Sequence, residues 1–342
     1  MELNTHVDPF FSVVIPTRNR PELFKLALDS VLSQKFDRFE VIIVNDGSTD
    51  EFLQRYQVIQ DQADDKVTFC RLVHRPNGHG QSYSMNYGVH QAKGEYVCFL
   101  DDDDFWIDDM HLQKAYDSIS HSQDQVDAYY TNQDAYFADG SKQTNNVWIE
   151  DLQYKLADQK CDSAGSYQVD LGFLLSSQGF AHLNCSIVRK ELYQRIGGMD
   201  ENIRYECDRD IYNRTIDASD NILYNPAVIS KHHIPDVSKK DNMSTLVSFS
   251  EKLIYQLRVY EKGIALSKNH QMVKYCATGN MYILKKLAQG FYERQDIKRA
   301  AYFARQALGL KFTPQWFAFS MYLTIMSFKK KPSLNDKRRS IE

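Results

Sequence analysis

Four consecutive aspartates, Asp101 to Asp104, are the residues in this sequence best suited to bind a metal ion. They follow the apolar segment 95–100 (EYVCFL), which is typical of a buried strand. Adjacent carboxylates repel one another, so they are either fully solvated or arranged around a cation. On an extended chain Asp101 and Asp103 would point the same way, and their hard oxygens suit Mg²⁺ or Mn²⁺. The alternative is a solvated acidic turn that caps a helix beginning near Phe105, but the position at a strand's carboxyl end favours a metal site.

Polar residues also stand at the ends of three other apolar runs. Thr17 and Arg18 follow the first run, Asp46 follows the second and Asn77 the third. In doubly wound sheets, ligands bind beyond the carboxyl ends of the strands. These positions, taken with the aspartates, therefore predict one ligand site along a single edge of the sheet.

The elements that would position these residues alternate between strands and helices over the first hundred residues. Short apolar, β-branched runs predict a strand buried on both faces at residues 10–16, a second buried strand at 39–44, and further strands at 67–73 and 95–100. Helix signals lie between them, at residues 21–34, after the turn at 45–50 and at about 82–91. The alternation predicts an α/β fold with a doubly wound, mainly parallel sheet flanked by helices.

The rest of the chain predicts a second, smaller part. The strand–helix pattern weakens between residues 128 and 190, and residues 197–217 predict a loop followed by a helix. From about Thr245 the chain is helical and amphipathic to its end. We therefore expect an α/β domain over residues 1–244 and a C-terminal helical region with a basic tail over residues 245–342.

Composition excludes some classes of function. A net charge of −4 over 342 residues argues against nucleic-acid binding, which usually needs a basic domain. The six cysteines show no CxxC pair or zinc-binding spacing, which favours free thiols in a reducing compartment. No secretory signal and no apolar run of the ~18–20 residues needed to span a membrane is present. These features together predict a cytoplasmic protein.

Five segments of the chain resemble the family 2 glycosyltransferases, which have the GT-A fold and transfer sugars with inversion. The segments are residues 13–20 (VVIPTRNR), 39–50 (FEVIIVNDGSTD), 77–86, 94–104 (GEYVCFLDDDD) and 197–212, which contains GGMDE and DRDIY. Their order and spacing match as well as their content, and the resemblance covers roughly residues 10–240. It implies that the sheet predicted above is of the GT-A type.

The resemblance implies a role for each matching residue on the donor side. Asp46 would accept a hydrogen bond from the imide N–H of uracil or thymine, although an Asx turn or a helix cap would also explain an aspartate there. Asp101 would reach the ribose, and Asp103 would bind the metal, Mn²⁺ or Mg²⁺. The other residues assigned to substrate binding are Pro16, Thr17, Arg18, Asn77, Asn86, Asp102 and Asp210.

The catalytic base of the family is an aspartate in a Glu-Asp-x-Asp segment, and Asp208 takes that position here. Cys207 replaces the expected glutamate, and Glu206 stands one residue earlier. The alternative for Asp208 is an acidic residue that favours the positive end of a helix. Met85 replaces an arginine that is frequent in the family. His233 matches a late histidine of the family and would complete the metal or diphosphate site.

These assignments predict an inverting glycosyltransferase. A divalent ion would screen the charge that gathers on the leaving diphosphate, while Asp208 removes a proton from the acceptor hydroxyl. The donor would be a nucleotide sugar, with UDP favoured, and the acceptor a saccharide or lipid-linked saccharide of the cell envelope. The departures at Cys207 and Met85 keep open a non-catalytic module that binds nucleotide sugars or carbohydrates. A nucleotidyltransferase or a dehydrogenase is disfavoured, since no glycine-rich loop follows the first strand.

The segment 312–331 allows two interpretations. It is mostly apolar and leads into a basic tail, so it could lie on the inner face of an anionic membrane, which would suit a lipid-linked acceptor. The alternative is a helix that packs against the first domain or against a second copy in a homodimer, with a solvated tail. The segment is too short to span a bilayer comfortably.

Overall fold

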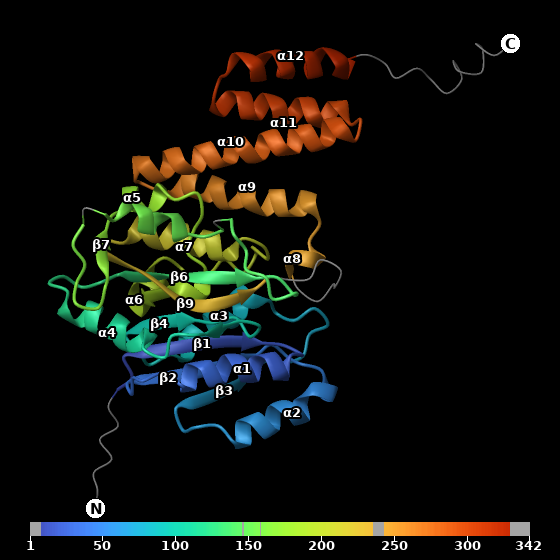
Figure 1. Ribbon diagram of the computed structural model, residues 1–342. Helices are drawn as coiled ribbons and strands as arrows, with labels where there is room; N and C mark the ends of the chain where they lie inside the picture. Colours follow the sequence, from blue (N-terminus) through green and yellow to red (C-terminus); the bar gives the residue numbers. More distant parts are fainter. Residues whose placement is uncertain (1–7, 146, 158, 235–242, 329–342) are drawn as a thin grey trace, which may run out of the picture. The chain divides into compact units, whose positions relative to one another are not determined.

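The computed structural model describes residues 8–145, 147–157, 159–234 and 243–328. The chain forms two compact units, Met1–Val247 and Ser248–Glu342 (Figure 1). The division comes just after the boundary that the sequence predicted near residues 240–245.

The first hundred residues fold into the predicted alternation of strands and helices. The elements are β1 (Phe11–Thr17), α1 (Pro21–Leu32), β2 (Phe39–Asn45), α2 (Asp50–Asp61), β3 (Val67–Arg71), α3 (Gln81–Gln91) and β4 (Tyr96–Phe99). Strands β3, β2, β1 and β4 lie side by side in that order, and all their pairings are parallel. Thr17 pairs with Asn45, so the loops after β1 and β2 leave the sheet at the same edge. The predicted α/β fold is confirmed.

The sheet continues with strands from later in the chain. The elements are β5 (Phe105–Trp106), α4 (His111–His121), β6 (Ala128–Tyr136), the 3-10 segment η1 (Glu150–Lys155), β7 (Tyr167–Val169), α5 (Leu171–Leu175), η2 (Leu183–Cys185), β8 (Ser186–Arg189), α6 (Lys190–Arg195), α7 (Cys207–Ala218) and β9 (Ile222–His233). The order beyond β4 is β8, β6, β9 and β5, with β7 beside β9. Strand β8 is antiparallel to both of its neighbours, whereas β6 and β9 are parallel. The sheet is therefore mixed, and its parallel pairings dominate the N-terminal half.

The helix expected near Phe105 does not form. Phe105 and Trp106 make the short strand β5 against the end of β9, and α4 begins only at His111. Trp106 is buried, and its indole N–H donates to the carbonyl of Asn184 at 3.1 Å. Aromatic residues suit such a half-buried strand, and this long-range pairing overrides the local helix signal. The aspartates therefore form a turn between β4 and β5 instead of a helix cap.

Helices cover both faces of the sheet (Figure 1). On one face, Phe24 and Val31 of α1 share a hydrophobic core with Val13 of β1 and with residues of α4. On the other face, Gly88 of α3 lies against Val14, where an added Cβ would come within 2.3 Å of a valine methyl carbon. Helix α3 can therefore lie close to the strands, which sets the position of its N-terminal residues at the functional edge.

The second unit is helical, as predicted. Its helices are α9 (Phe249–Leu266), α10 (His270–Glu293), α11 (Ile297–Leu310) and α12 (Pro314–Phe328), while α8 (Met243–Leu246) belongs to the first unit. Each of these four helices packs against the next. Ser248 and Glu251 form a capping box at the start of α9. No helix among the described residues is long and apolar enough to cross a membrane. The basic tail, residues 329–342, lies outside the described residues.

Candidate active site

The turn between β4 and β5 brings three of the four aspartates together. Carboxylate oxygens of Asp101, Asp103 and Asp104 lie within 4.8 Å of one another. The side chain of Asp101 accepts a hydrogen bond from Nε2 of Gln81 at 2.6 Å. Burial, together with the charges of Asp103 and Asp104, raises the pKa of Asp101 well above its ordinary value. Such a group of carboxylates would be stabilised by a divalent cation.

Asp102 is engaged differently, because it forms an ion pair with Arg20 from the loop after β1. Arg20 also donates to Asp103 at 2.8 Å. The side chain of Asp102 is buried, and burial raises its pKa to about 7 even though Arg20 acts in the opposite direction. Arg20 therefore ties the loop after β1 to the aspartate turn and places a fixed cation beside Asp103.

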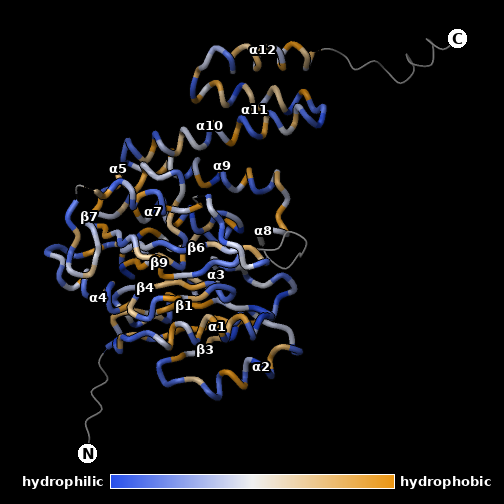
Figure 2. The backbone as a smooth tube through the Cα atoms, viewed as in Figure 1, coloured by the Kyte–Doolittle hydropathy of each residue, from blue (hydrophilic) through white to orange (hydrophobic). Residues whose placement is uncertain are grey.

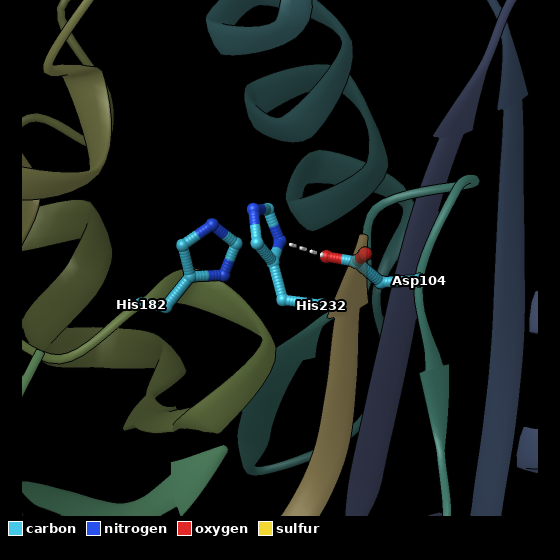
Figure 3. Close-up of side chains that lie close together, drawn as sticks. All are labelled: Asp104, His182 and His232. Carbon is cyan, nitrogen blue, oxygen red and sulfur yellow. Dashed lines mark hydrogen bonds and ion pairs between the residues drawn. The ribbon is translucent and has the colours of Figure 1, made fainter. Parts of the chain in front are cut away.

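Two histidines lie next to the aspartate turn (Figure 3). His232 of β9 hydrogen-bonds through Nδ1 to Asp104 at 2.7 Å, and Nε2 of His182 lies 3.8 Å from Asp101. Burial and the neighbouring His232 lower the pKa of His182 to about 3, so its ring is neutral near pH 7. Burial alone would lower the pKa of His232, but Asp104, Asp103 and Asp101 raise it above the ordinary value. Carboxylates suit Mn²⁺ and Mg²⁺, and neutral imidazole is a common metal ligand.

His233 lies at the rim of this group. Its side chain is half exposed, and Nδ1 hydrogen-bonds to the backbone carbonyl of Asp103 at 2.7 Å. Its Nδ1 lies 3.9 Å from the Asp104 carboxylate, whereas Nδ1 of His232 lies 2.7 Å from it. The geometry therefore favours His232 over the predicted His233 as the histidine nearest to the carboxylates.

Asp208 stands in the first turn of α7. Burial and the charge of Glu206 raise its pKa to about 6, although Arg209 works against this shift. Glu206 itself is paired with Arg209 at 2.5 Å. Asp210 is buried and pairs with Arg214 at 2.6 Å, within the same helix. Asp208 can therefore accept a proton near neutral pH. Asp210 instead forms an ion pair with Arg214 one turn further along the same helix.

Gln81 connects the aspartate turn to the start of α7. Its amide nitrogen donates to Asp101, and its amide oxygen lies 3.7 Å from the thiol sulfur of Cys207. Cys207 is buried and directly precedes Asp208. One side chain at the N-terminus of α3 thus holds the carboxylate cluster and the neighbour of Asp208 in a single network.

Asp46 at the end of β2 anchors the loop that leads into α3. It accepts hydrogen bonds from the backbone N–H of His79 and of Gly80, and from Nδ1 of the His79 ring at 2.7 Å. An added Cβ at Gly78 would lie 2.5 Å from the Asp46 carboxylate, so only glycine fits there. These hydrogen bonds of the Asp46 carboxylate all go to residues 79 and 80, and it is Asn45 beside it that bonds locally, by accepting from the N–H of Ser48.

The loops after β1 and β3 meet beside Asp46. The backbone N–H of Asp46 donates to the carbonyl of Thr17 at 2.9 Å. Arg18 donates to the carbonyls of Arg75 and Pro76 at 2.8 and 3.0 Å. Two other residues predicted to bind substrate, Pro16 and Asn77, belong to these same two segments of the chain. The structure therefore brings these predicted substrate-binding residues together with Asp46 at one edge.

Asn86 does not point toward this edge. Its amide nitrogen donates to the carbonyl of Met199 and to Glu201, and its amide oxygen accepts from Tyr193 and from the N–H of Met199. These bonds fasten α3 to the turn that precedes α7. Met85, beside it, is fully buried. The geometry supports a structural role for Asn86 rather than the predicted contact with substrate.

Comparison with known proteins decides the family. The model of the family described as glycosyl transferase family 2 matches residues 12–197, which is more than half of the chain. The chain belongs to glycosyl transferase family 2.

The curated relatives of this glycosyltransferase include an uncharacterized glycosyltransferase of Rickettsia typhi, 26% identical over 245 residues, which covers 69% of this chain and 67% of the relative. Another is a GalNAc(5)-diNAcBac-PP-undecaprenol beta-1,3-glucosyltransferase of Campylobacter jejuni, 34% identical over 116 residues. That match covers 33% of this chain and 37% of the relative, so the shared region is about a third of each protein.

Solved structures share the fold of this glycosyltransferase. Staphylococcus aureus TarS in complex with UDP matches with a TM-score of 0.62 and 17% identity, covering 93% of this chain and 88% of TarS. The mannosyltransferase PcManGT of Pyrobaculum calidifontis, in complex with GDP-Man and Mn²⁺, matches with a TM-score of 0.57 and 17% identity, covering 95% and 82% of the two chains. The GT-A type of fold expected from the sequence is thereby confirmed.

Several residues of the glycosyltransferase site are absent from the sequence-based predictions. Three of them, Gln81, Arg20 and His79, lie within segments that resemble the family. Each forms its hydrogen bond in the site with an aspartate at least 20 residues away in the sequence. His182 gives no local signal at all, and His232 directly precedes the predicted His233.

Proposed function

We propose that this glycosyltransferase moves a sugar from a UDP-linked donor, with inversion, to a hydroxyl group of a saccharide or lipid-linked saccharide in cell-envelope synthesis. The observation that carries the proposal is the Gln81 network, which joins the aspartate cluster to the start of α7 beside Asp208. A site for a diphosphate-bound metal and a base with a raised pKa then adjoin one another. A non-catalytic binding module needs no base with a raised pKa beside a metal site, so this combination favours an enzyme.

The surroundings of Asp46 support a base that offers an imide N–H. A carboxylate has about four lone-pair positions. Asp46 uses them for the N–H of His79, the N–H of Gly80 and the His79 ring, which must donate because a carboxylate only accepts. About one position is left for a ligand. Uracil can donate its imide N–H to it, whereas cytosine and adenine have no such group.

The carboxylate and imidazole groups of the cluster fit a divalent metal. Asp103 would hold Mn²⁺ or Mg²⁺, with His232 or His233 as a nitrogen ligand, and Asp101, which the resemblance assigns to the ribose, lies close enough to share the ion. When bound, the ion supplies positive charge that stabilises the leaving diphosphate. Arg20 keeps Asp103 in place through its hydrogen bond, and Asp104 is held in turn by His232 and by Asn184 at 2.6 Å.

Asp208 is the residue that would take the proton from the acceptor hydroxyl. Its pKa of about 6 leaves it ionised at neutral pH, yet makes it a stronger base than an ordinary aspartate. Attack by the activated hydroxyl displaces the nucleoside diphosphate in one step, so an α-linked donor gives a β product. Loops between residues 128 and 190 would select the acceptor.

A panel of nucleotide sugars tests the proposal directly. Release of nucleoside diphosphate is followed for UDP-, GDP- and TDP-linked sugars in the presence of Mn²⁺ or Mg²⁺, with and without saccharide acceptors. We expect UDP-sugars to give the fastest release, and product anomers of inverted configuration by NMR. Binding of UDP without turnover of any donor would favour the module instead, and preferential use of GDP-sugars would overturn the assignment of the base.

The rate of transfer is expected to fall as the pH drops through about 6. Asp208 acts only as the carboxylate, and burial with Glu206 raises its pKa to about 6, so protonation removes the base below that pH. A single ionisation predicts a decline of about tenfold per pH unit. The profile of kcat against pH is measured with saturating donor.

Asp102, whose pKa is raised to about 7, titrates nearby and must be separated from Asp208. The variant Asp102→Asn removes that group, and the acidic limb should persist in it. If kcat of Asp102→Asn no longer falls at acidic pH, the fall in the wild type is due to Asp102, which would contradict the role of Asp208.

A further inference from the structure

Helix α12 carries an exposed face that is almost wholly apolar. Phe317, Met321, Tyr322, Ile325 and Phe328 are between 43% and 82% exposed. Their spacing of three or four residues places them on one side of the helix. Hydrophobic residues recur along α12 in Figure 2, and no charged residue occurs between positions 314 and 328.

The opposite side of α12 is already used for packing. Leu323 and Ser320 are buried, and Trp316 and Phe319 contact the small residues Ala300 and Ala304 of α11. The exposed face is therefore not needed to complete this core. The end helix of a stacked array usually presents a polar face to water, because exposed apolar area is unfavourable there. Helix α12 departs from that rule along its whole length.

The stretch of sequence that contains this helix is strongly basic. Residues 297–342 contain ten lysines and arginines but only two acidic residues, a net charge of +8, although the whole chain has a net charge of −4. Three lysines, Lys329 to Lys331, directly follow α12 in the sequence. An apolar helix face within a basic segment is typical of helices that bind the interface of an anionic lipid membrane.

We propose that α12 binds the interface of an anionic lipid membrane, with its exposed apolar face among the lipid chains and the neighbouring basic residues on the headgroups. At ~1.5 Å per residue the helix is about 22 Å long, shorter than the ~30 Å hydrocarbon core, so it would lie in the surface. A second copy of the chain fits less well. A two-fold contact would place the same patch against itself and bring the two positive segments together.

Vesicle binding by the full chain tests this proposal without any assay of activity. Co-sedimentation is measured with phosphatidylcholine vesicles and with vesicles that contain roughly one third phosphatidylglycerol. We expect at least about tenfold tighter binding to the anionic vesicles, and a loss of about tenfold in the variant Ile325→Glu. Replacing Lys329, Lys330 and Lys331 by glutamine should weaken binding to the anionic vesicles alone.

The matched control is Leu26→Glu on α1, since Leu26 is 58% exposed and Ile325 is 57% exposed. This control should bind vesicles like the wild type, and circular dichroism checks that both variants remain folded. Failure of the wild type to bind anionic vesicles, or unchanged binding by Ile325→Glu, would overturn the proposal. A dimer in light scattering that Ile325→Glu dissociates, without vesicle binding, would assign the face to a second copy.

Discussion

Replacing Asp208 by asparagine is expected to lower kcat for sugar transfer by about 10²–10⁴-fold, the range for loss of a general base. The amide is nearly the same size but cannot accept the acceptor's proton. The Kd for donor should stay within about twofold, because the base touches the acceptor rather than the nucleotide. Single-turnover transfer and calorimetric titration of UDP measure the two quantities separately.

The matched control for this variant is Asp217→Asn, which makes the same chemical change in the last turn of α7. It should leave kcat nearly unchanged. Parallel loss of donor binding and activity in Asp208→Asn would indicate that Asp208 supports the structure of the site, and full activity in that variant would remove it from the mechanism.

Replacing Asp103 by asparagine is expected to reduce transfer roughly 10³-fold and to remove its dependence on metal. The expectation follows from the loss of a charged ligand whose ion contributes several kcal/mol to stabilising the diphosphate. Asp103 shares the cluster with Asp101 and Asp104, whose carboxylate oxygens lie within 4.8 Å of its own. Titration of Mn²⁺ in the presence of UDP, with transfer measured before and after chelation, gives both readouts.

Asp109→Asn serves as the control, because Asp109 follows the same turn but pairs on the surface with Lys35. It should bind Mn²⁺ like the wild type. Transfer by the wild type that is equally fast in a chelator would contradict the metal assignment, whatever the effect of Asp103→Asn.

The first half of the sheet could be predicted from the sequence because its information is local. Strands β1, β2 and β4 are buried on both faces, and helices separate the strands along the chain, so their apolar runs and the parallel order follow from the pattern. The sequence does not predict that β8 inserts antiparallel to its neighbours. Its four residues are all buried, and such a short apolar run is the same whichever way the strand runs. The same holds at Phe105, where pairing with β9 decides the structure.

The sequence by itself predicted the family, which the comparisons confirm, and it placed the proposed site carboxylates Asp46, Asp101, Asp103 and Asp208 in the chain. These residues directly follow strands or begin a helix, so their neighbours in the chain are enough to place them. Only the tertiary structure decided the partners of those carboxylates. Asn184 and His232 reach Asp104 across 80 and 128 residues of sequence, and Gln81 meets Cys207 across 126. Contacts of that separation depend on how strands and helices pack together, which no local pattern of residues contains.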